Sequence, residues 1–228
     1  ASDVILAPCE YVKKDMKIFY KLKKPISVLY NPVDKKNILE KSNEQSERSD
    51  DIFSNKLPTI ISVGRLHPVK NYPFLIRSFS LVLSELDCQL IILGEGEELN
   101  SLKKLVNQLN LTNKVFFLGF QANPYMYIAK SSVLALTSLH EGLPNVLIQA
   151  GILNVPSISV NCSGGIKELL NPQFISEYGN EAEFSNILYK TMIKTTQNTL
   201  LEGLEFPSDV EFAFKLKTFC YEKNNNSM

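Results

Sequence analysis

The sequence lacks close cysteine pairs, an excess of either charge and long apolar runs, and each absence excludes a class of protein. Its four cysteines, Cys9, Cys88, Cys162 and Cys220, are widely spaced, with no CxxC pair. This spacing favours free structural thiols in a reducing compartment over a disulfide framework or a zinc site. The 24 basic residues balance 24 acidic ones, whereas nucleic-acid-binding proteins usually carry a basic excess. We therefore expect no nucleic-acid partner, although net charge does not restrict where a few cations converge.

The apolar runs are too short for a membrane protein. Val133-Leu134-Ala135-Leu136 is typical of them and falls far below the length that crosses a bilayer. The start, Ala1 to Leu6, has neither the cationic region nor the long apolar stretch of a secretory signal. It also lacks an initiator methionine, which fits a chain whose beginning has been lost. We expect a cytoplasmic location, with any membrane contact peripheral and at the inner face.

Composition divides the chain into four parts. Residues 1–34 have the pattern of a strand at 4–7, a helix at about 10–20 and a strand at 26–30, followed by Asn31-Pro32-Val33-Asp34. Val4 would begin the first strand. Residues 35–57 are polar and charged with few large apolar side chains, and such a composition buries little surface. We expect a solvated linker or loose helix there. Residues 58–200 alternate strands with helices, and residues 201–228 form a helical tail.

The region from 58 to 200 predicts the fold class. Thr59–Val63 and Gln89–Leu93 are apolar runs typical of buried strands. Apolar residues repeat at helical spacing between Tyr72 and Leu86. Further short strands are predicted near residues 115–118, 133–136 and 157–160. Strands separated by helices form βαβ units, so we predict an α/β fold with a doubly wound parallel sheet. In such sheets ligands bind beyond the carboxyl ends of the strands.

The first strand-end loop, Gly64 to Asn71, carries two cations. Gly64 permits close backbone approach, and Arg65 and Lys70 place a guanidinium and an ammonium on one turn before a helix. This combination can hold a pyrophosphate. Two solvated surface cations would give the same sequence, and these residues alone leave both interpretations open.

The second loop, Gly94-Glu95-Gly96-Glu97-Glu98-Leu99, resembles the start of a dinucleotide fingerprint. However, Leu99 occupies the third glycine position, and two acidic residues stand where a phosphate would bind. A helix start whose dipole is complemented by Glu97 and Glu98 explains the pattern better.

The third loop, Ser138 to Gln149, contains more candidate ligand-binding groups than the other loops. Pro144 suits the first position of a helix, so the N–H groups of Gly142, Leu143 and Asn145 would point out of the helix start toward an anion. Glu141 precedes that start, and Gln149 lies two turns further on roughly the same face. An ordinary capped helix is the alternative, and His140 is more typical of a packing or turn residue. In the fourth loop, Gly164-Gly165 precedes a helix and suits either a ligand or a tight turn.

Six segments in order resemble glycosyltransferase family 4, retaining enzymes of the GT-B type with two Rossmann-like domains around a cleft. The resemblance runs from Asp3 to about Leu170. It rests on the following segments: NPVD at 31–34, ISVGRLHPVKN at 61–71, LIILGEGEE at 90–98, KVFFLGF at 114–120, SLHEGLPNVLIQA at 138–150 and SGGIKELL at 163–170. It identifies 58–200 as the nucleotide-sugar-binding domain and 1–34 as a remnant of the N-terminal acceptor domain.

The resemblance implies a role for each matching position. Arg65 and Lys70 would hold the donor diphosphate and stabilise the departing nucleoside diphosphate, and Glu141 would face the donor sugar. The backbone of Gly142, Leu143 and Asn145 would contact sugar or phosphate, with Gly64 nearby. The loop at Phe120 would meet the nucleobase, largely through the main chain. The resemblance implies no metal and no cofactor, because two basic side chains and a helix start supply the charge.

Two positions depart from the family pattern. The second Glu of the Glu-x7-Glu motif is Gln149 here, which loses the charge-assisted part of its hydrogen bonds to ribose, about 1–2 kcal/mol of donor affinity. The usual Gly before the x-Pro-Val strand is Asn154, which also tolerates the left-handed conformation.

The resemblance implies transfer of a hexosyl or N-acetylhexosaminyl group, with retention, from a nucleotide sugar. A UDP-sugar is favoured, and the acceptor would be a glycan or a lipid-linked glycan of surface polysaccharide or glycolipid synthesis. The rival is a truncated, non-catalytic nucleotide-sugar-binding remnant, favoured by Gln149 and by the missing N-terminal domain, which would be a further partner. The family-4 motifs around Arg65, Lys70 and Glu141 argue against a nucleotide-sugar epimerase. Leu99 at the third glycine position of the fingerprint argues against an NAD-type enzyme.

Overall fold

A computed structural model describes residues 5–194, 199–201 and 203–221. Its centre is a six-stranded sheet in the order β5-β4-β3-β6-β7-β8, in which every neighbouring pair is parallel. The strands are β3 (Thr59–Val63), β4 (Gln89–Leu93), β5 (Val115–Gly119), β6 (Val133–Leu136), β7 (Ser157–Val160) and β8 (Ile175–Ser176). The predicted parallel α/β sheet is confirmed.

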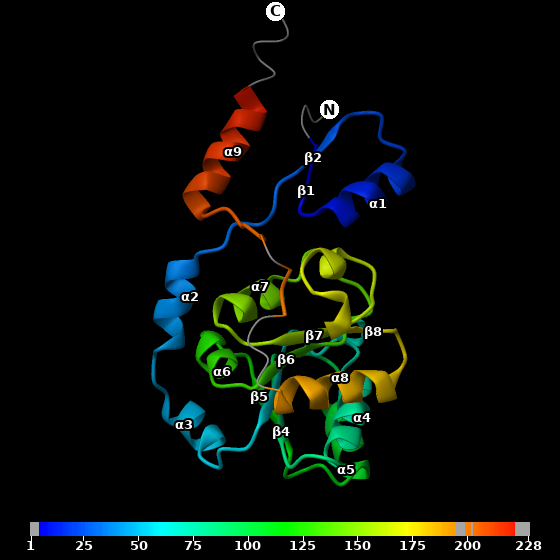
Figure 1. Cartoon of the computed structure of the whole chain (residues 1–228), viewed down its shortest axis with the longest axis vertical. Coiled ribbons are helices and arrows are strands. Elements are labelled where there is room, and N and C mark those ends of the chain that lie inside the picture. Colours follow the sequence, from blue (N-terminus) through cyan, green and yellow to red (C-terminus); the bar gives the residue numbers. More distant parts are fainter. Residues whose placement is uncertain (1–4, 195–198, 202, 222–228) are drawn as a thin grey trace, which may run out of the picture.

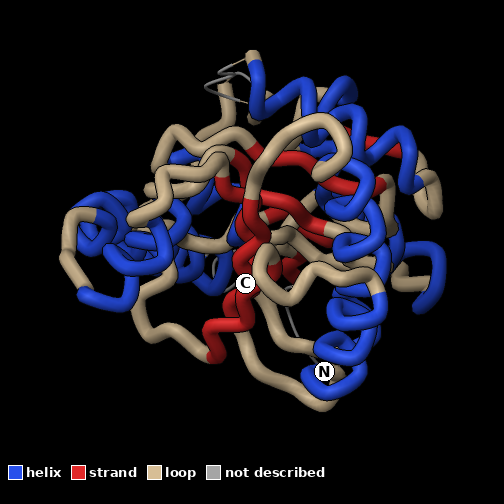
Figure 2. Tube along the Cα trace, turned by 90° about the horizontal axis from the view of Figure 1, so that it is seen from below, coloured by secondary structure: helices blue, strands red, loops and turns tan. Residues whose placement is uncertain are grey.

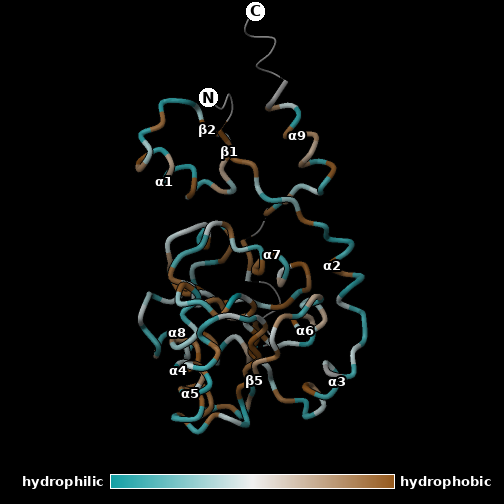
Figure 3. Tube along the Cα trace, turned by 180° about the vertical axis from the view of Figure 1, so that it is seen from behind, coloured by the Kyte–Doolittle hydropathy of each residue, from teal (hydrophilic) through white to brown (hydrophobic). Residues whose placement is uncertain are grey.

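Helices cover both faces of the sheet (Figures 1 and 2). Side chains alternate across a strand, so Ile60 packs with one hydrophobic cluster and Ile61 with the other. The first cluster includes side chains of α4 (Tyr72–Val82), α5 (Leu99–Gln108) and α8 (Glu181–Ile193). The second includes side chains of α6 (Tyr125–Ala129) and α7 (Asn145–Ile152). Figure 3 shows the hydrophobic residues gathered along the strands between these layers.

The N-terminal residues form a separate small unit. Strands β1 (Ile5–Ala7) and β2 (Ile26–Val28) pair in parallel around α1 (Glu10–Tyr20). The C-terminal helix α9 (Asp209–Tyr221) lies at the same end of the molecule (Figure 1), and a cavity between them is lined by Val28 and Phe214. The predicted strand, helix and strand are all present, although the second strand is shorter than predicted. Val4, predicted to begin the first strand, lies outside the described residues.

The polar segment before the sheet is more ordered than its composition predicted. It contains two helices, α2 (Lys35–Ser42) and α3 (Glu47–Phe53), where a solvated linker or loose helix was expected. Ile38 and Ser49 are buried. Lys130, at the end of α6, holds α3 through hydrogen bonds to Ser49 (2.9 Å) and Asp50 (2.6 Å). Polar contacts therefore fix a segment that buries little apolar surface.

The remaining short elements complete the strand-end loops. They are the single-turn helices η1 (Pro68–Lys70), η2 (Gly165–Glu168) and η3 (Pro172–Phe174). Helix α4 ends at Val82, one turn before the predicted Leu86. Within the described part of the chain, no helix combines the length and apolarity that crossing a bilayer requires.

Candidate functional site

Backbone hydrogen bonds join the strand-end loops into a continuous rim. The last residue of β5 accepts a bond from the loop after β4 (Gly94 N–H to Gly119 O, 2.8 Å), and that loop bonds to the one after β3 (Leu66 N–H to Glu95 O, 2.8 Å). The next two links are Leu139 N–H to Val69 O (2.8 Å) and Glu141 N–H to Ser163 O (2.9 Å). The rim therefore follows the order of the strands, because parallel strands all end at one edge of the sheet.

Lys70 and Glu141 meet at the middle of this rim. The Nζ atom of Lys70 lies 2.6 Å from Oε1 of Glu141, and both side chains are mostly buried. Thr137 donates a hydrogen bond to the Lys70 carbonyl (2.9 Å), which anchors η1 against the end of β6. Ser138 donates to the same Oε1 atom of Glu141 (2.6 Å). Within the described residues Oε2 of Glu141 accepts no hydrogen bond, so it is available to a ligand.

Arg65 lies on the same loop as Lys70, but its side chain is exposed and has no hydrogen-bond or ion-pair partner among the described residues. Gly64 is held by its carbonyl, which accepts a hydrogen bond from the buried Tyr72 hydroxyl (2.9 Å). A Cβ at Gly64 would lie 3.2 Å from that hydroxyl and 3.3 Å from the Lys70 side chain. Glycine there lets the Lys70 chain pass close to the backbone.

The loop after β4 is built for packing. Gly94 has a φ of +140°, and a Cβ there would collide with the carbonyl of Gly64. A Cβ at Gly96 would collide with Leu66. Both glycines are therefore required for close packing of this loop against the loop after β3. This packing role agrees with the interpretation of the loop as a helix start and not as a dinucleotide fingerprint. Helix α5 begins at Leu99, directly after Glu98.

The turn before α7 presents free backbone donors. The helix begins at Asn145, and Pro144, with ψ of 95°, is its N-cap and not its first helical residue as predicted. Within the described residues, the N–H groups of Gly142 and Leu143 find no acceptor. A Cβ at Gly142 would meet nothing within 4 Å, which makes this turn open, whereas the Leu143 side chain is buried. Only the Leu143 backbone is therefore positioned to contact a ligand.

Gln149 lines a cavity to which neither Lys70 nor Glu141 contributes. The cavity is small, with a volume of about 110 Å³, and is also lined by Asn145, Tyr125 and Asp34. Asp34 caps α2 by accepting from the Asn37 N–H (2.9 Å), and Asn145 accepts from the Asn31 side chain (3.1 Å). Of the two positions of the Glu-x7-Glu motif, Gln149 lines this cavity and Glu141 does not.

Phe120 stands at the β5 end of the rim. Its side chain is 71% exposed, and its N–H donates to Oε1 of Glu95 (3.3 Å). Gly119, with φ of +73°, allows the chain to turn there. The exposed ring and the backbone beside it are accessible to a planar group.

Glu168 joins the N-terminal unit to the sheet, a role that the sequence did not reveal. Its carboxylate accepts the N–H groups of Glu10 (3.0 Å) and Tyr11 (2.7 Å), and the Tyr30 hydroxyl (3.2 Å). Although distant in sequence, Glu168 therefore caps the start of α1, where the helix dipole favours a negative charge. The sequence could not predict this contact, because the partner of Glu168 is a backbone N–H group 158 residues away.

The paired glycines of the fourth loop serve the neighbouring turn. Gly164 has a φ of +132°, and a Cβ there would collide with the carbonyl of Glu141. Gly165 donates to the carbonyl of Gly142 (2.7 Å). His140 Nδ1 lies 2.8 Å from the Ser163 hydroxyl, which agrees with its interpretation as a turn residue. The tight-turn interpretation therefore fits both glycines.

Burial controls the thiols near the rim. It raises the pKa of Cys162 to about 11, with a further contribution from the Glu141 carboxylate. Burial also raises the pKa of Cys9, which lies at the start of α1 beside Gly165. Both thiols are therefore protonated at neutral pH. Among the described residues, no group of three or more His, Cys, Asp or Glu side chains is arranged to hold a metal.

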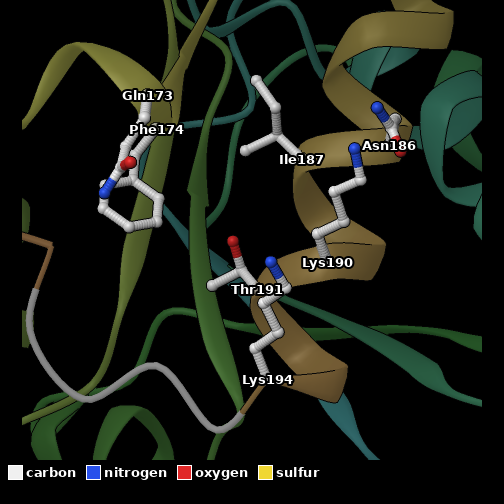
Figure 4. Close-up of a pocket in the computed structure, with 7 residues that line it drawn as sticks. All are labelled: Gln173, Phe174, Asn186, Ile187, Lys190, Thr191 and Lys194. Carbon is white, nitrogen blue, oxygen red and sulfur yellow. The ribbon is translucent and has the colours of Figure 1, made fainter.

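A hollow between η3 and α8 lies apart from the predicted site (Figure 4). It has a volume of about 330 Å³ and is lined by Phe174, Lys190 and Lys194 among others. None of the predicted site residues lines it. The loops at the strand ends, and not this hollow, gather the predicted residues.

Comparison with known proteins decides the family. The model of the family described as "Glycosyl transferases group 1" matches residues 43–191. An uncharacterized glycosyltransferase of Methanocaldococcus jannaschii is 38% identical over 175 residues, which is 75% of this chain and 43% of that protein. The chain belongs to the group 1 glycosyltransferases.

Some relatives of this glycosyltransferase chain are named for amylovoran biosynthesis in Erwinia amylovora and for lipopolysaccharide galactosyl transfer in Escherichia coli. Another relative is the N-acetylgalactosamine-N,N'-diacetylbacillosaminyl-diphospho-undecaprenol 4-alpha-N-acetylgalactosaminyltransferase of Campylobacter jejuni. It is 34% identical over 182 residues, 80% of this chain and 44% of that protein. The chain thus spans less than half the length of these curated relatives.

Solved structures confirm the GT-B type of fold. The apo form of the lipopolysaccharide outer core galactosyltransferase WaaB aligns with a TM-score of 0.71 at 22% identity, covering 97% of this chain and 62% of that one. Anabaena HepE in complex with UDP aligns with a TM-score of 0.72 at 16% identity, covering 97% and 64%.

Proposed function

We propose that this chain is the donor-binding half of a retaining family-4 enzyme that transfers a hexosyl or N-acetylhexosaminyl group from a UDP-sugar. The acceptor is a glycan or a lipid-linked glycan of surface polysaccharide or glycolipid synthesis. The observation that carries the proposal is the rim itself. Within it, Lys70 lies beside Glu141, and Arg65 and the N–H groups of Gly142 and Leu143 have no partner among the described residues.

The order of the rim matches an elongated nucleotide sugar. The exposed Phe120 at one end suits a planar base, and Arg65 and Lys70 suit the diphosphate. Oε2 of Glu141 and the Gly142 turn then face the sugar. When the bond from the anomeric carbon to the diphosphate breaks, the electron pair leaves with the diphosphate, and fixed cations stabilise that charge most where water is excluded. The acceptor oxygen forms the new bond to the same carbon on the face that the diphosphate leaves, and its proton passes to an oxygen of the departing diphosphate.

Gln149 favours a second candidate function, that of a non-catalytic protein. A carboxylate would accept stronger hydrogen bonds from ribose than this amide does, so a non-catalytic nucleotide-sugar-binding remnant is the alternative. Positioning of the acceptor accounts for several kcal/mol of a transfer barrier, and in a two-domain cleft both halves contribute to it. In the part of the chain that the structure describes, the N-terminal unit has two strands.

The test is transfer of radiolabelled sugar from UDP-sugars to lipid acceptors by the purified chain, alone and with an N-terminal half supplied from a relative. We expect no appreciable transfer by the chain alone and transfer by the combined protein. Slow hydrolysis of the donor by the chain alone fits an intact donor site open to water. Robust transfer by the chain alone would contradict the two-part design, and a combined protein that binds donor without transferring would favour the remnant.

We also propose peripheral contact with the inner face of a membrane, through the end of α1. Ile18, Phe19 and Tyr20 are 70%, 74% and 72% exposed. Consecutive helical residues point about 100° apart, so one flat neighbour cannot cover all three, whereas lipid can surround a helix end. Lysines at 17, 21 and 23 flank them, as in interfacial helices that bind anionic lipid. Co-sedimentation with phosphatidylglycerol vesicles should fall in Phe19→Ser and not in Phe214→Ser, a matched exposed aromatic on α9.

A further inference from the structure

A cavity of about 480 Å³ lies between α1 and the loop that follows β7. From α1 it is lined by Tyr11 and Lys14, and from the loop by Asn161, Ser163 and Lys167, among others. Its size falls in the common range of small-molecule sites. None of the residues predicted to bind the donor lines it.

The lysines of this cavity outnumber its unpaired carboxylates. Of its two carboxylates, Glu10 pairs with Lys13 at 2.9 Å. Glu168 has no cationic partner among the described residues, but its bonds to two N–H groups at the start of α1 place it at the positive end of a helix dipole, which offsets part of its charge. Lys14 and Lys167 are exposed, and the part of the chain that the structure describes offers neither an acidic partner. Two free ammonium groups facing a shared cavity attract an anionic ligand.

The cavity also lies next to the reacting end of the proposed donor site. Ser163 lines it, and the carbonyl of the same residue accepts from the Glu141 N–H at 2.9 Å. Along the rim the loops follow the order base, diphosphate and sugar from Phe120 to Glu141. The loop of Ser163 is therefore the next position beyond the sugar, on the side where an acceptor must approach.

We propose that this cavity binds the phosphate group of an anionic acceptor through Lys14 and Lys167. Phosphate is the ligand whose charge matches two ammonium groups. The Ser163 hydroxyl can donate to it when His140 Nδ1, 2.8 Å away, carries a proton and donates to Ser163. The identity of the ligand as acceptor rests on the proposed function, whereas the presence of an anion site beside α1 does not. A lipid diphosphate and a soluble sugar phosphate share this chemistry.

The experiment is calorimetric titration of the 228-residue chain with inorganic pyrophosphate while the donor site is saturated with UDP. We expect one pyrophosphate site to remain, and Lys14→Gln or Lys167→Gln to weaken it by roughly tenfold each, as loss of a charge-assisted contact does. Lys104→Gln, an exposed lysine on α5, is the matched control and should change nothing. Thermal unfolding of each variant establishes that the chain is folded.

The outcomes separate the two proposals. Pyrophosphate binding that UDP abolishes, or that survives unchanged in the Lys14→Gln/Lys167→Gln double variant, would overturn the anion site. Failure of UDP to bind, with pyrophosphate still dependent on both lysines, would reject the donor function and leave the cavity site standing. Titration with a short-chain isoprenyl diphosphate and with a hexose 1-phosphate then distinguishes a lipid source from a soluble one. A chain that binds neither compound contradicts the proposal.

Discussion

Lys70 and Glu141, 71 residues apart in sequence, form an ion pair of 2.6 Å at the point where β3 and β6 end side by side. Glu141 holds the Lys70 ammonium group in place, and its carboxylate also competes with any anionic ligand that binds Lys70. Breaking a mostly buried pair leaves an uncompensated charge, so a diphosphate that approaches Lys70 takes over a role that Glu141 plays in the free chain.

The substitution Glu141→Gln should therefore separate diphosphate binding from sugar binding. The new amide would keep a hydrogen bond to Ser138 or Lys70 but remove the competing charge, so we expect UDP to bind several-fold more tightly. The extra affinity of a UDP-sugar over UDP should disappear, because the carboxylate proposed to face the sugar is gone. Titration calorimetry with both ligands measures this, and weaker binding of UDP would show that Glu141 orients Lys70 for the phosphate.

The change Gln149→Glu should strengthen nucleotide binding by about 1–2 kcal/mol, because an ionised carboxylate accepts stronger hydrogen bonds from ribose hydroxyls. The structure adds a condition, since Asp34 lines the same small cavity and two carboxylates there would repel each other. The gain should be larger in an Asp34→Asn background, in which Asn still caps α2. If affinity is unchanged in both backgrounds, Gln149 does not contact the nucleotide.

Removing the cap on α1 should loosen the N-terminal unit. Glu168→Ala deletes an acceptor for two backbone N–H groups, and loss of such a cap costs about 1–2 kcal/mol. Urea unfolding followed by circular dichroism measures the loss, with the exposed Glu85→Ala as control. Equal stability of the two variants would mean that the contact between the unit and the sheet does not depend on Glu168.

Much of the sheet could be predicted from sequence, because runs such as Thr59–Val63 and Gln89–Leu93 are largely apolar and followed by glycine. Strand order could not be predicted, and the meeting of Lys70 with Glu141 follows from that order. The docking of the helices at 35–57 could not be predicted, because it depends on Lys130 and on single buried residues such as Ile38. Pro144 was placed one position too far into its helix, since proline suits both positions.

Alkaline pH should destabilise the chain through its buried thiols. Burial raises the pKa of Cys88 to about 12 from an ordinary 9.0, so between these values the unfolded thiol ionises while the folded one stays protonated. The unfolded state then binds fewer protons, and the free energy of unfolding falls as pH rises, by up to about 1.4 kcal/mol per pH unit for one thiol. Cys88→Ala should show a shallower decline between about pH 9 and 10.5 in urea titrations. Parallel declines would show that this thiol ionises equally in both states.

The central claim is that Arg65 and Lys70 form a diphosphate site in this chain, and calorimetric titration with UDP and UMP tests it most directly. We expect UDP to bind more tightly than UMP, and Arg65→Ala and Lys70→Ala each to weaken UDP binding by about 1.5–3 kcal/mol, the usual worth of a charge-assisted hydrogen bond. UMP binding should change much less, because its single phosphate does not span both cations. Equal UDP affinity in the wild-type chain and in the double variant would contradict the account.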